Sequence, residues 1–267
     1  MKNKVFIVFD SLRWDVFKKA RTPFLNRLGV WKKAYSQGTY TLPAHMSFFV
    51  GKLPQVFDQT NYYDCTASRI TKAGGLQRYD QLWRLDNPEA PRTANEVLQG
   101  SNIIEGFRQI GYRTIGTGAV NWFNPDLAAA KCLTAAFENF RFFGGPNHRS
   151  HYSSEDQVDW VISLLHKTSK PYFLFINLGE THHRFVYKNC PWMDDRLEPY
   201  GDKRKCFERQ RLCLEYLDGI IQHLFSELTN YSLVMCADHG EAFGEGGLWG
   251  HGFFHKKVME VPLLIEH

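Results

Sequence analysis

The stretch KVFIVFD, residues 4–10, decides the fold class. After Lys4, five apolar residues follow one another, and all of them are β-branched or aromatic. Such a run is typical of a strand that is buried on both faces of a parallel sheet. Asp10 follows the run at once. Because ligands of parallel sheets bind beyond the carboxyl ends of the strands, we treat Asp10 as a candidate site residue.

Two further segments repeat this pattern of a buried strand followed by an acid. YFLFINL, residues 172–178, ends shortly before Glu180, and YSLVMCA, residues 231–237, ends directly before Asp238 and His239. The carboxyl ends of parallel strands meet at one edge of a sheet, so these side chains are expected to lie near Asp10.

Helical patterns separate the strands. NIIEGFRQIGYRTIGTGAV, residues 102–120, indicates an amphipathic helix, a stop at Gly111 and a further strand. Residues 204–228 form the longest helical pattern, and VPLLIE, residues 261–266, is the last candidate strand. This alternation predicts an α/β fold, with a mostly parallel sheet flanked by helices on both faces.

The length of the chain and the lack of a linker or repeat in its sequence favour one domain. A chain of 267 residues can bury a large α/β core, and no Pro/Ser-rich linker, low-complexity stretch or fixed-period repeat divides it. We therefore expect a single domain over residues 1–267. Within it, residues 52–92 and 184–203 lack clear periodicity and are interpreted as insertions or loops.

Charge and hydropathy exclude several classes of function. The formal net charge of +4 is small, and Lys and Arg are scattered rather than aligned on one helix, which argues against nucleic-acid binding. A mildly basic chain can still favour a small anionic substrate. The N-terminal apolar run is too short for a signal peptide, and no segment approaches the roughly 18 to 20 apolar residues of a membrane span. We expect a cytoplasmic protein that binds no membrane; its oligomeric state is left open.

The six cysteines form no CxxC pair and no spacing typical of a zinc knuckle. In a cytoplasmic protein they are expected to be reduced. Cys190 and Cys206 flank a polar insertion, but the compartment argues against a disulfide between them.

The stretch QGTYTLPAHMSFFVG, residues 37–51, has two readings. Pro43 suits the first turn of a helix and a preceding threonine can cap it, so the segment fits an ordinary helix entry. The same residues could also hold a nucleophile, Thr41, at the start of a helix. The local sequence does not separate the two.

The acids at the strand ends predict a metal site. One such acid would be explained by a turn or a helix cap, but Asp10, Glu180 and Asp238 follow three separate strands, and His239 stands beside one of them. Two aspartates, an imidazole and a hydroxyl suit Mn²⁺ or Zn²⁺. Mg²⁺ or Ca²⁺ fit less readily, because an imidazole nitrogen disfavours ions that prefer oxygen.

The sequence resembles the alkaline phosphatase/sulfatase superfamily, specifically its sulfatase-like branch. Two helical segments, GFRQIGYRTIGTG at 106–118 and CLEYLDGIIQHLFSEL at 213–228, support the resemblance. Three more specific motifs carry it, in the order of the family and over nearly the whole chain: VFIVFDSLRWD at 5–15, TYTLPAHMSFFVGKLP at 39–54, and ADHGEAFGEGGLWGHGFFHKKVMEVPLLI at 237–265.

The resemblance implies a set of site residues. Asp10 corresponds to the first metal-binding acid, and Asp238 with His239 corresponds to the later metal pair. Thr41 stands where sulfatases carry the modified cysteine or serine of their C/S-x-P-x-R motif, which implies that Thr41 is both nucleophile and metal ligand.

Three further histidines are candidates for catalysis. His45 stands where the sulfatase motif has its arginine, and His251 lies near the lysine or histidine that contacts the anionic group of the substrate. His251, His182 or His183 could donate a proton to the leaving group or activate water. His182 and His183 are adjacent, so on an extended segment they face opposite sides, and we favour His183.

The departures from the family pattern bear on the group that is transferred and on the number of metal ions. Threonine cannot be oxidised to the formylglycine that sulfatases use, which favours phosphoryl transfer. Members with two zinc ions carry an Asp-x-x-x-His pair, whereas the position four residues after Glu180 is Arg184. A second metal, or the substrate, would then involve Glu180 with His182, His183 or His251. The chain stops after EVPLLIEH, where larger relatives continue into a C-terminal subdomain, so we expect a minimal version without it.

These observations predict a metal-dependent hydrolase of phosphate mono- or diesters that forms a phosphothreonine intermediate. A phosphotransferase is the nearest alternative, because it shares the first half-reaction, and a sulfatase-like ester hydrolase remains another. A degenerate, non-catalytic binding module is the alternative from a different class, and metal content would separate it from the enzymes.

Overall fold

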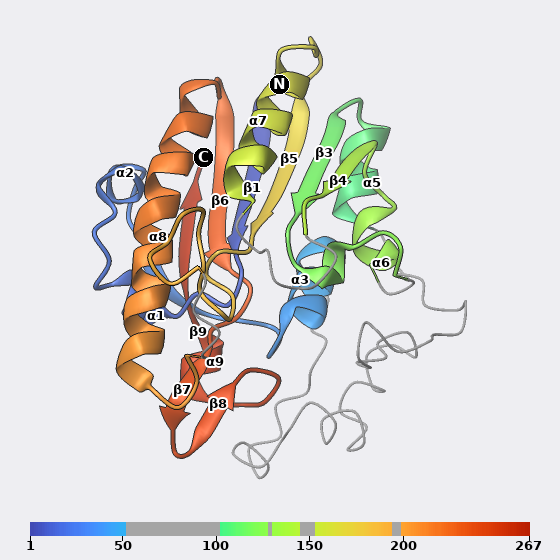
Figure 1. Ribbon diagram of the computed structural model, residues 1–267. Helices are drawn as coiled ribbons and strands as arrows, with labels where there is room; N and C mark the ends of the chain where they lie inside the picture. The colour runs from blue at the N-terminus through green and yellow to red at the C-terminus, as the bar shows by residue number, and fades with distance from the viewer. Residues whose placement is uncertain (52–101, 128–129, 145–152, 194–198) are drawn as a thin grey trace.

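A seven-stranded sheet forms the centre of the molecule, with strand order β2-β9-β6-β1-β5-β3-β4 (Figure 1). The computed structural model describes residues 1–51, 102–127, 130–144, 153–193 and 199–267. The strands of the sheet are β1 (Asn3–Phe9), β2 (Lys32–Tyr35), β3 (Arg113–Gly118), β4 (Asn139–Phe142), β5 (Tyr172–Leu178), β6 (Tyr231–Ala237) and β9 (Glu260–Glu266).

Most of this sheet is parallel, as the alternation of strands and helices predicted. Strand β1 pairs in parallel with β5 and β6, and β3 pairs in parallel with β4 and β5. Only β9 runs in the opposite direction, antiparallel both to β6 and to the edge strand β2. In the register of the centre, Phe9 stands opposite both Leu178 and Ala237, so β1, β5 and β6 end level with one another. The residues that follow these strands therefore share one edge of the sheet.

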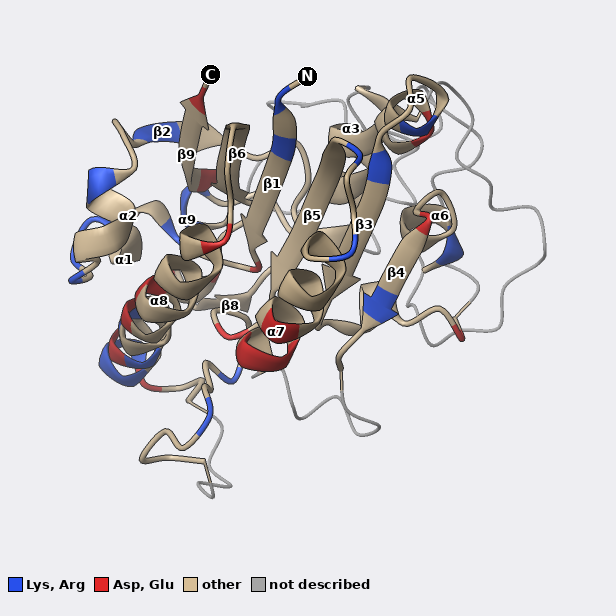
Figure 2. Cartoon of the chain, turned by 90° about the horizontal axis from the view of Figure 1, so that it is seen from above, with Lys and Arg blue, Asp and Glu red and all other residues tan. Residues whose placement is uncertain are grey.

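Helices cover both faces of the sheet (Figures 1 and 2). One hydrophobic layer packs the sheet against α1, α2, α7 and α8, and the other packs it against α3, α5, α6 and α9. Their bounds are α1 (Trp14–Phe17), α2 (Pro23–Arg27), α3 (Thr41–Val50), α5 (Ile103–Gln109), α6 (Lys131–Thr134), α7 (Ser154–Leu165), α8 (Lys203–Ser226) and α9 (Lys256–Met259).

Strand β1 shows why the sequence specifies two layers. Its alternate residues Val5, Ile7 and Phe9 belong to the first layer, while Val8 and the partly buried Phe6 belong to the second. A strand that contributes apolar side chains to both faces needs a continuous apolar run, which is what residues 5–9 supply. The short helical turn η2 (Asn121–Phe123) adds Phe123 to the second layer.

The longest helix, α8, begins where Asp202 accepts hydrogen bonds from the backbone N–H groups of Arg204 and Lys205, at 3.0 Å each. This cap satisfies two of the N–H groups that every helix start leaves open. No helix in the described ranges combines the length and the apolar character that a membrane crossing requires. Lys and Arg are spread over α2, β2, β4 and α8 rather than gathered on one surface (Figure 2).

The described parts of the 184–203 insertion, residues 184–193 and 199–202, pack against the fold and are called the strap here. The ring of Tyr187 stacks on Tyr216 of α8, with ring centroids 4.7 Å apart. The indole N–H of Trp192 donates to the carbonyl oxygen of Phe185 at 2.7 Å. The other expected insertion, residues 52–92, lies outside the described residues.

The cysteines in the described part of the chain are unpaired, as expected. Five cysteines lie in the described part of the chain, and each is a free thiol: Cys132, Cys190, Cys206, Cys213 and Cys236. The sixth, Cys65, lies outside it.

Candidate functional site

The ends of β1 and β6 bring two aspartates together. Asp10 and Asp238 directly follow the paired residues Phe9 and Ala237, and both side chains are fully buried. The backbone N–H of Ser11 donates to Asp238 Oδ1 at 3.0 Å, which ties the two strand ends to each other. The structure thus joins two residues that stand 228 positions apart in sequence (238 − 10).

His239 completes a triangle of donor atoms. Its Nε2 lies 3.8 Å from Asp10 Oδ1 and 3.6 Å from Asp238 Oδ2. Its Nδ1 lies 2.8 Å from the carbonyl oxygen of Gly240, which accepts a hydrogen bond from Nδ1–H and leaves the Nε2 lone pair facing the aspartates. Three buried donor atoms of the types that bind Mn²⁺ or Zn²⁺ therefore converge.

Thr41 joins this group from the start of α3. Its Oγ1 lies 3.4 Å from Asp10 Oδ2 and 3.5 Å from His239 Nε2. The N-cap residue of α3 is Tyr40, in an extended conformation, so Thr41 is the first helical residue rather than the cap. The hydroxyl points to the acids, so residues 37–51 form a helix entry whose first residue also faces the strand ends.

A glycine lets the loop before α3 lie against the first turn of that helix. A Cβ atom on Gly38 would meet the backbone N of Ala44 at 2.5 Å, well inside contact distance. The hydroxyl of Ser36 donates to the carbonyl oxygens of Gly38 and Asp238, with the first of these bonds at 2.7 Å. The loop before α3 is therefore fastened directly to the residue that ends β6.

The electrostatics of the aspartate pair call for a cation. Burial raises the pKa of Asp238 well above its usual range, and the charge of Asp10 raises it further. Burial alone would raise the pKa of Asp10 too, but the neighbouring rings of His182, His239 and His45 and a hydrogen bond from Asn177 hold it below its usual value. Two buried carboxylates at one point are costly unless positive charge offsets them.

The donor atoms fit a divalent metal ion. In a tetrahedral zinc site, bond lengths of about 2.0 to 2.2 Å separate neighbouring ligand atoms by about 3.3 to 3.6 Å, close to the separations found among Asp10, Thr41, Asp238 and His239. Asp238 Oδ2 is buried and accepts no hydrogen bond from the described residues. Burial, followed by the nearby His251, lowers the pKa of His239 to about 3, which keeps the ring neutral and able to act as a ligand.

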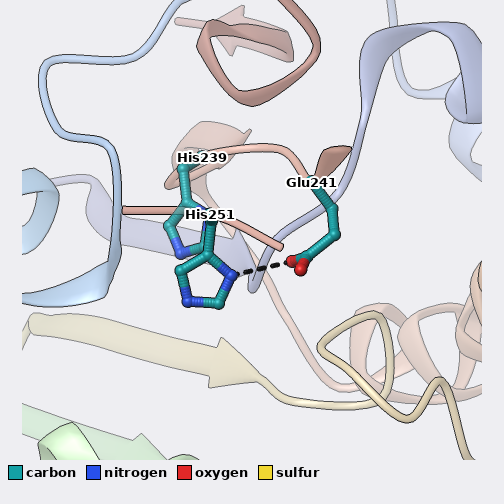
Figure 3. A group of neighbouring side chains, drawn as sticks. All are labelled: His239, Glu241 and His251. Carbon is teal, nitrogen blue, oxygen red and sulfur yellow. Dashed lines mark hydrogen bonds and ion pairs between the residues drawn. The ribbon is translucent and has the colours of Figure 1, made fainter. Parts of the chain in front are cut away.

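A second group of side chains lies beside the first. The ring of His251 lies 4.5 Å from that of His239 and 5.4 Å from that of His182, between centroids. His182 Nε2 is 4.0 Å from Asp10 Oδ1. His251 Nδ1 lies 2.9 Å from Glu241 Oε2, as Figure 3 shows. The strands β7 (Ala242–Glu245) and β8 (Leu248–Gly250) form the hairpin that returns His251 to His239.

The structure differs from the expectation for the histidine pair. Residues 180–184 form a tight turn, in which the N–H of His182 donates to the carbonyl oxygen of Gly179 at 3.0 Å. This turn, rather than an extended segment, directs His182 to Asp10, while the ring of His183 stacks on Tyr200 at 4.1 Å. His182 replaces His183 as the candidate that faces the aspartates.

His45 also takes a different place from the one expected of a catalytic residue. Its ring is fully buried, and its Nδ1 bonds to the carbonyl oxygen of Thr41, one helical turn earlier, at 2.8 Å. Burial lowers its pKa to about 4. Nδ1 lies 3.7 Å from Asp238 Oδ2, so His45 supports the site from behind. The ring meets four phenylalanine rings edge to face: Phe48, Phe49, Phe123 and Phe175.

Glu180 is turned toward helix α7 instead of toward a second metal. Its Oε1 accepts a hydrogen bond from the backbone N–H of Ser154, the first residue of α7, at 2.8 Å. Burial raises its pKa to about 7. The position of Glu180 after a strand predicted a metal ligand, whereas its side chain serves as a helix cap.

Two residues that form hydrogen bonds with Asp10 were not predicted from the sequence. Asn177 Nδ2 donates to Asp10 Oδ2 at 3.2 Å, and Thr181 Oγ1 donates to the carbonyl oxygen of Asp10 at 2.7 Å. Asn177 is the one polar residue in the apolar run of β5. A buried amide needs hydrogen-bond partners, so that interruption was the available signal.

Comparisons with known proteins show the family and the fold of this chain. A model of the Sulfatase family matches residues 2–266. Among solved structures, a phosphonate monoester hydrolase of Agrobacterium radiobacter superposes with a TM-score of 0.64 at 14% identity, covering 99% of this chain and 68% of that one. The C-terminal periplasmic domain of phosphoethanolamine transferase EptC from Campylobacter jejuni superposes with a TM-score of 0.61 at 14% identity, covering 99% and 79%.

The same domain of EptC from Escherichia coli, in complex with Zn, gives a TM-score of 0.61 at 13% identity and covers 100% of this chain and 73% of that one. The chain thus spans between 68% and 79% of the length of these three neighbours. No curated protein matches the sequence. At such identities the superpositions establish the fold, which is that of alkaline phosphatase and the sulfatases.

Proposed function

Because the chain belongs to the sulfatase family, we propose that it is a metal-dependent hydrolase of phosphate mono- or diesters that works through a phosphothreonine on Thr41. The observation that carries the proposal is the place of Thr41 Oγ1, 3.4 Å from Asp10 Oδ2 and 3.5 Å from His239 Nε2 at the start of a helix. A hydroxyl in that position has acceptors beside it and backbone N–H donors around it.

Asp10, Asp238, His239 and Thr41 would hold the metal, for which Mn²⁺ or Zn²⁺ suits an imidazole ligand better than Mg²⁺ or Ca²⁺. When bound, a divalent ion lowers the pKa of a hydroxyl ligand and offsets the negative charge that develops on a transferred phosphoryl group. Residues of this chain carry out the bond-forming, bond-breaking and proton-transfer steps.

In the first half-reaction, Thr41 Oγ1 gives its proton to Asp10 Oδ2, 3.4 Å away, and forms a bond to phosphorus, while the bond from phosphorus to the leaving-group oxygen breaks. His251 or His182 donates a proton to that oxygen, so that it departs as an alcohol. Both rings lie next to the nucleophile group, and both are partly exposed to solvent. The free N–H groups at the start of α3 face the phosphoryl oxygens and stabilise their charge.

In the second half-reaction, water attacks the phosphorus of phosphothreonine. The same histidine, now neutral, takes the proton of the water, and the bond between phosphorus and Thr41 Oγ1 breaks. Inorganic phosphate or a phosphomonoester leaves, and Thr41 Oγ1 takes its proton back from Asp10.

The experiment is to trap the intermediate. The protein is reconstituted with Mn²⁺ or Zn²⁺, incubated with a phosphomonoester or phosphodiester and quenched in acid, and its peptides are analysed by mass spectrometry. A phosphate on the peptide that contains Thr41, present with substrate and absent from Thr41→Ala, is the expected result. Turnover without any phosphorylated Thr41 would point to a metal-bound water as the nucleophile instead.

A phosphotransferase is the second candidate, favoured by the superposition on phosphoethanolamine transferase EptC. It shares the first half-reaction, and an alcohol replaces water in the second. Adding acceptor alcohols to the enzyme during turnover separates the two: a transferase forms a new phosphoester, whereas a hydrolase releases phosphate at an unchanged rate.

A further inference from the structure

The strap places a tyrosine against Glu241, the hydrogen-bond partner of His251. Tyr200 donates a hydrogen bond from its hydroxyl to Glu241 Oε1. Its ring stacks on that of His183, 4.1 Å away, and lies 5.7 Å from the ring of Trp249 on β8. Trp249 stands two residues before His251. Tyr200 therefore contacts the turn after β5, the loop after β6 and the hairpin strand that leads to His251.

Glu241 is the link from Tyr200 to His251. Its carboxylate is fully buried, and each of its oxygens is engaged: Oε1 with the Tyr200 hydroxyl and Oε2 with His251 Nδ1, at 2.9 Å. The main chain of Glu241 is fixed separately, since its carbonyl oxygen accepts from Arg13 Nη1 at 3.3 Å. The hydroxyl of Tyr200 thus acts on the rotation of the carboxylate rather than on the backbone.

The orientation of this carboxylate decides what His251 presents to the site. A carboxylate accepts but does not donate, so His251 Nδ1 must carry the proton in this bond, and the lone pair or the second proton is on Nε2. With Nδ1 committed to Glu241 (Figure 3), the opposite edge of the ring, which carries Nε2, is the one left for other contacts.

We infer that Tyr200 is a positioning residue, which holds the side chain of Glu241 and thereby fixes the ring orientation and tautomer of His251. Without the Tyr200 hydroxyl, one oxygen of a buried carboxylate loses its donor, and the carboxylate turns to compete for other donors. His251 then loses its fixed partner and samples both tautomers. The consequence for turnover rests on the proposed function, whereas the consequence for the tautomer does not.

The test compares Tyr200→Phe with a control variant in the same strap, Tyr187→Phe. Phenylalanine at 200 keeps the ring contacts and removes only the hydroxyl. Tyr187 lies in the strap too, but its ring stacks on Tyr216 of α8. The imidazole nitrogens of ¹⁵N-histidine-labelled protein are observed by NMR at alkaline pH, where a neutral ring reports its tautomer directly, with His251 assigned by its loss in His251→Gln.

The expected result is a single Nδ1–H tautomer of His251 in the parent protein and in Tyr187→Phe, and a mixture of tautomers in Tyr200→Phe. Tyr200→Phe should also lower kcat by about 10-fold at unchanged metal content, the scale on which partners of an active-site ligand act. An unchanged tautomer in a folded Tyr200→Phe protein overturns the inference.

A second variant covers the case in which Tyr200→Phe does not fold. Glu241→Gln keeps the size of the side chain, but its amide oxygen can accept from only one of the two donors. A His251 tautomer that is unaltered in Glu241→Gln would likewise overturn the inference. If no phosphate ester is turned over with either metal, the proposed function fails, and the NMR result still decides the role of Tyr200.

Discussion

Thr41 Oγ1 lies 3.4 Å from Asp10 Oδ2, although Asp10 ends the first strand and Thr41 begins the helix on the opposite face of the sheet from α8. The contact exists because α3 starts at the same edge at which β1, β5 and β6 end. A helix start and three strand ends at one point give backbone N–H donors, carboxylates and a hydroxyl a common centre.

Replacing the hydroxyl of Thr41 tests this arrangement most directly. Thr41→Ala should lower kcat by at least about a thousand-fold, because only electrostatic stabilisation and binding remain once a nucleophile is lost. Metal affinity should largely survive, since two carboxylates and an imidazole are left. Thr41→Ser should keep measurable activity. Kinetics with a phosphate ester, combined with metal analysis by atomic emission, measures both quantities.

Retention of full turnover by Thr41→Ala would contradict the assignment of the nucleophile. Loss of bound metal together with turnover would show that the hydroxyl serves mainly as a ligand.

The buried pair of Asp10 and Asp238 should lower the stability of the metal-free protein and allow it to bind metal. In the metal-free protein, Asp238→Asn removes a buried charge next to Asp10 and keeps Oδ1 as the acceptor for the N–H groups of Ser11 and His239. We expect this variant to unfold at a higher temperature than the parent protein in the presence of a chelator. The order should reverse with Mn²⁺ or Zn²⁺ at about 100 times the Kd of the parent protein, where binding adds about 2.7 kcal/mol to its free energy of unfolding.

Thermal unfolding with chelator and with each metal measures the effect, and Asp159→Asn on the exposed side of α7 is the control. Metal stabilisation of Asp238→Asn equal to that of the parent protein would remove Asp238 from the ligand set.

Glu180 should make the stability of the protein depend on pH. Burial raises its pKa in the folded protein to about 7, from an ordinary value of 4.5. The folded state therefore binds the proton more tightly than the unfolded state, so the stability from this group is complete below about pH 4.5 and is lost as pH rises to about 7. Glu180→Gln does not titrate, and its amide oxygen can still accept from Ser154 N–H.

The variant should thus gain stability relative to the parent protein as pH rises, by up to about 3 kcal/mol. Urea unfolding at about pH 5 and about pH 8, in a chelator, measures the gain. Glu155→Gln is the matched control at the same helix start, because the Lys188 hydrogen bond lowers the pKa of Glu155. A difference between Glu180→Gln and the parent protein that does not change with pH would show that Glu180 is ionised in the folded state.

The central strands and the group of Asp10, Asp238 and His239 were predictable because short-range sequence patterns specify them. A continuous apolar run followed by an acid specifies both a buried strand and the place of its end, and level strand ends then bring Asp10, Asp238 and His239 together. The antiparallel pairing of β9 was not predictable in the same way. VPLLIE reads as a strand in either direction, and only the connection through the β7–β8 hairpin and α9 sets its course.

The side-chain directions in loops were the part that the sequence left open. An extended segment and a tight turn present His182 and His183 to different sides, and adjacent letters do not distinguish them. Glu180 follows a strand as Asp10 does, yet the helix start at Ser154 lies within its reach and takes its carboxylate. Tyr200 reaches Glu241 only through the packing of the strap, which no periodicity encodes.

Substrate preference offers the last test, and it separates phosphoryl from sulfuryl chemistry. Sulfatases use a hydrated aldehyde as nucleophile, so the sulfated enzyme breaks down by elimination. A sulfated Thr41 would lack that exit and would need water to attack sulfur directly. A phosphorylated Thr41 has developing charge on its phosphoryl oxygens, which the start of α3 and a divalent cation stabilise.

We therefore expect a higher kcat/KM for an aryl phosphate or aryl phosphodiester than for the aryl sulfate with the same leaving group. Initial rates for the matched esters, each with Mn²⁺ and with Zn²⁺, measure the ratio. The Thr41→Ala variant serves as the control that assigns both activities to this site. Sulfate turnover equal to or above phosphate turnover, lost in that variant, would mean that water reaches a sulfated threonine, and the protein would then act as a sulfatase without the aldehyde.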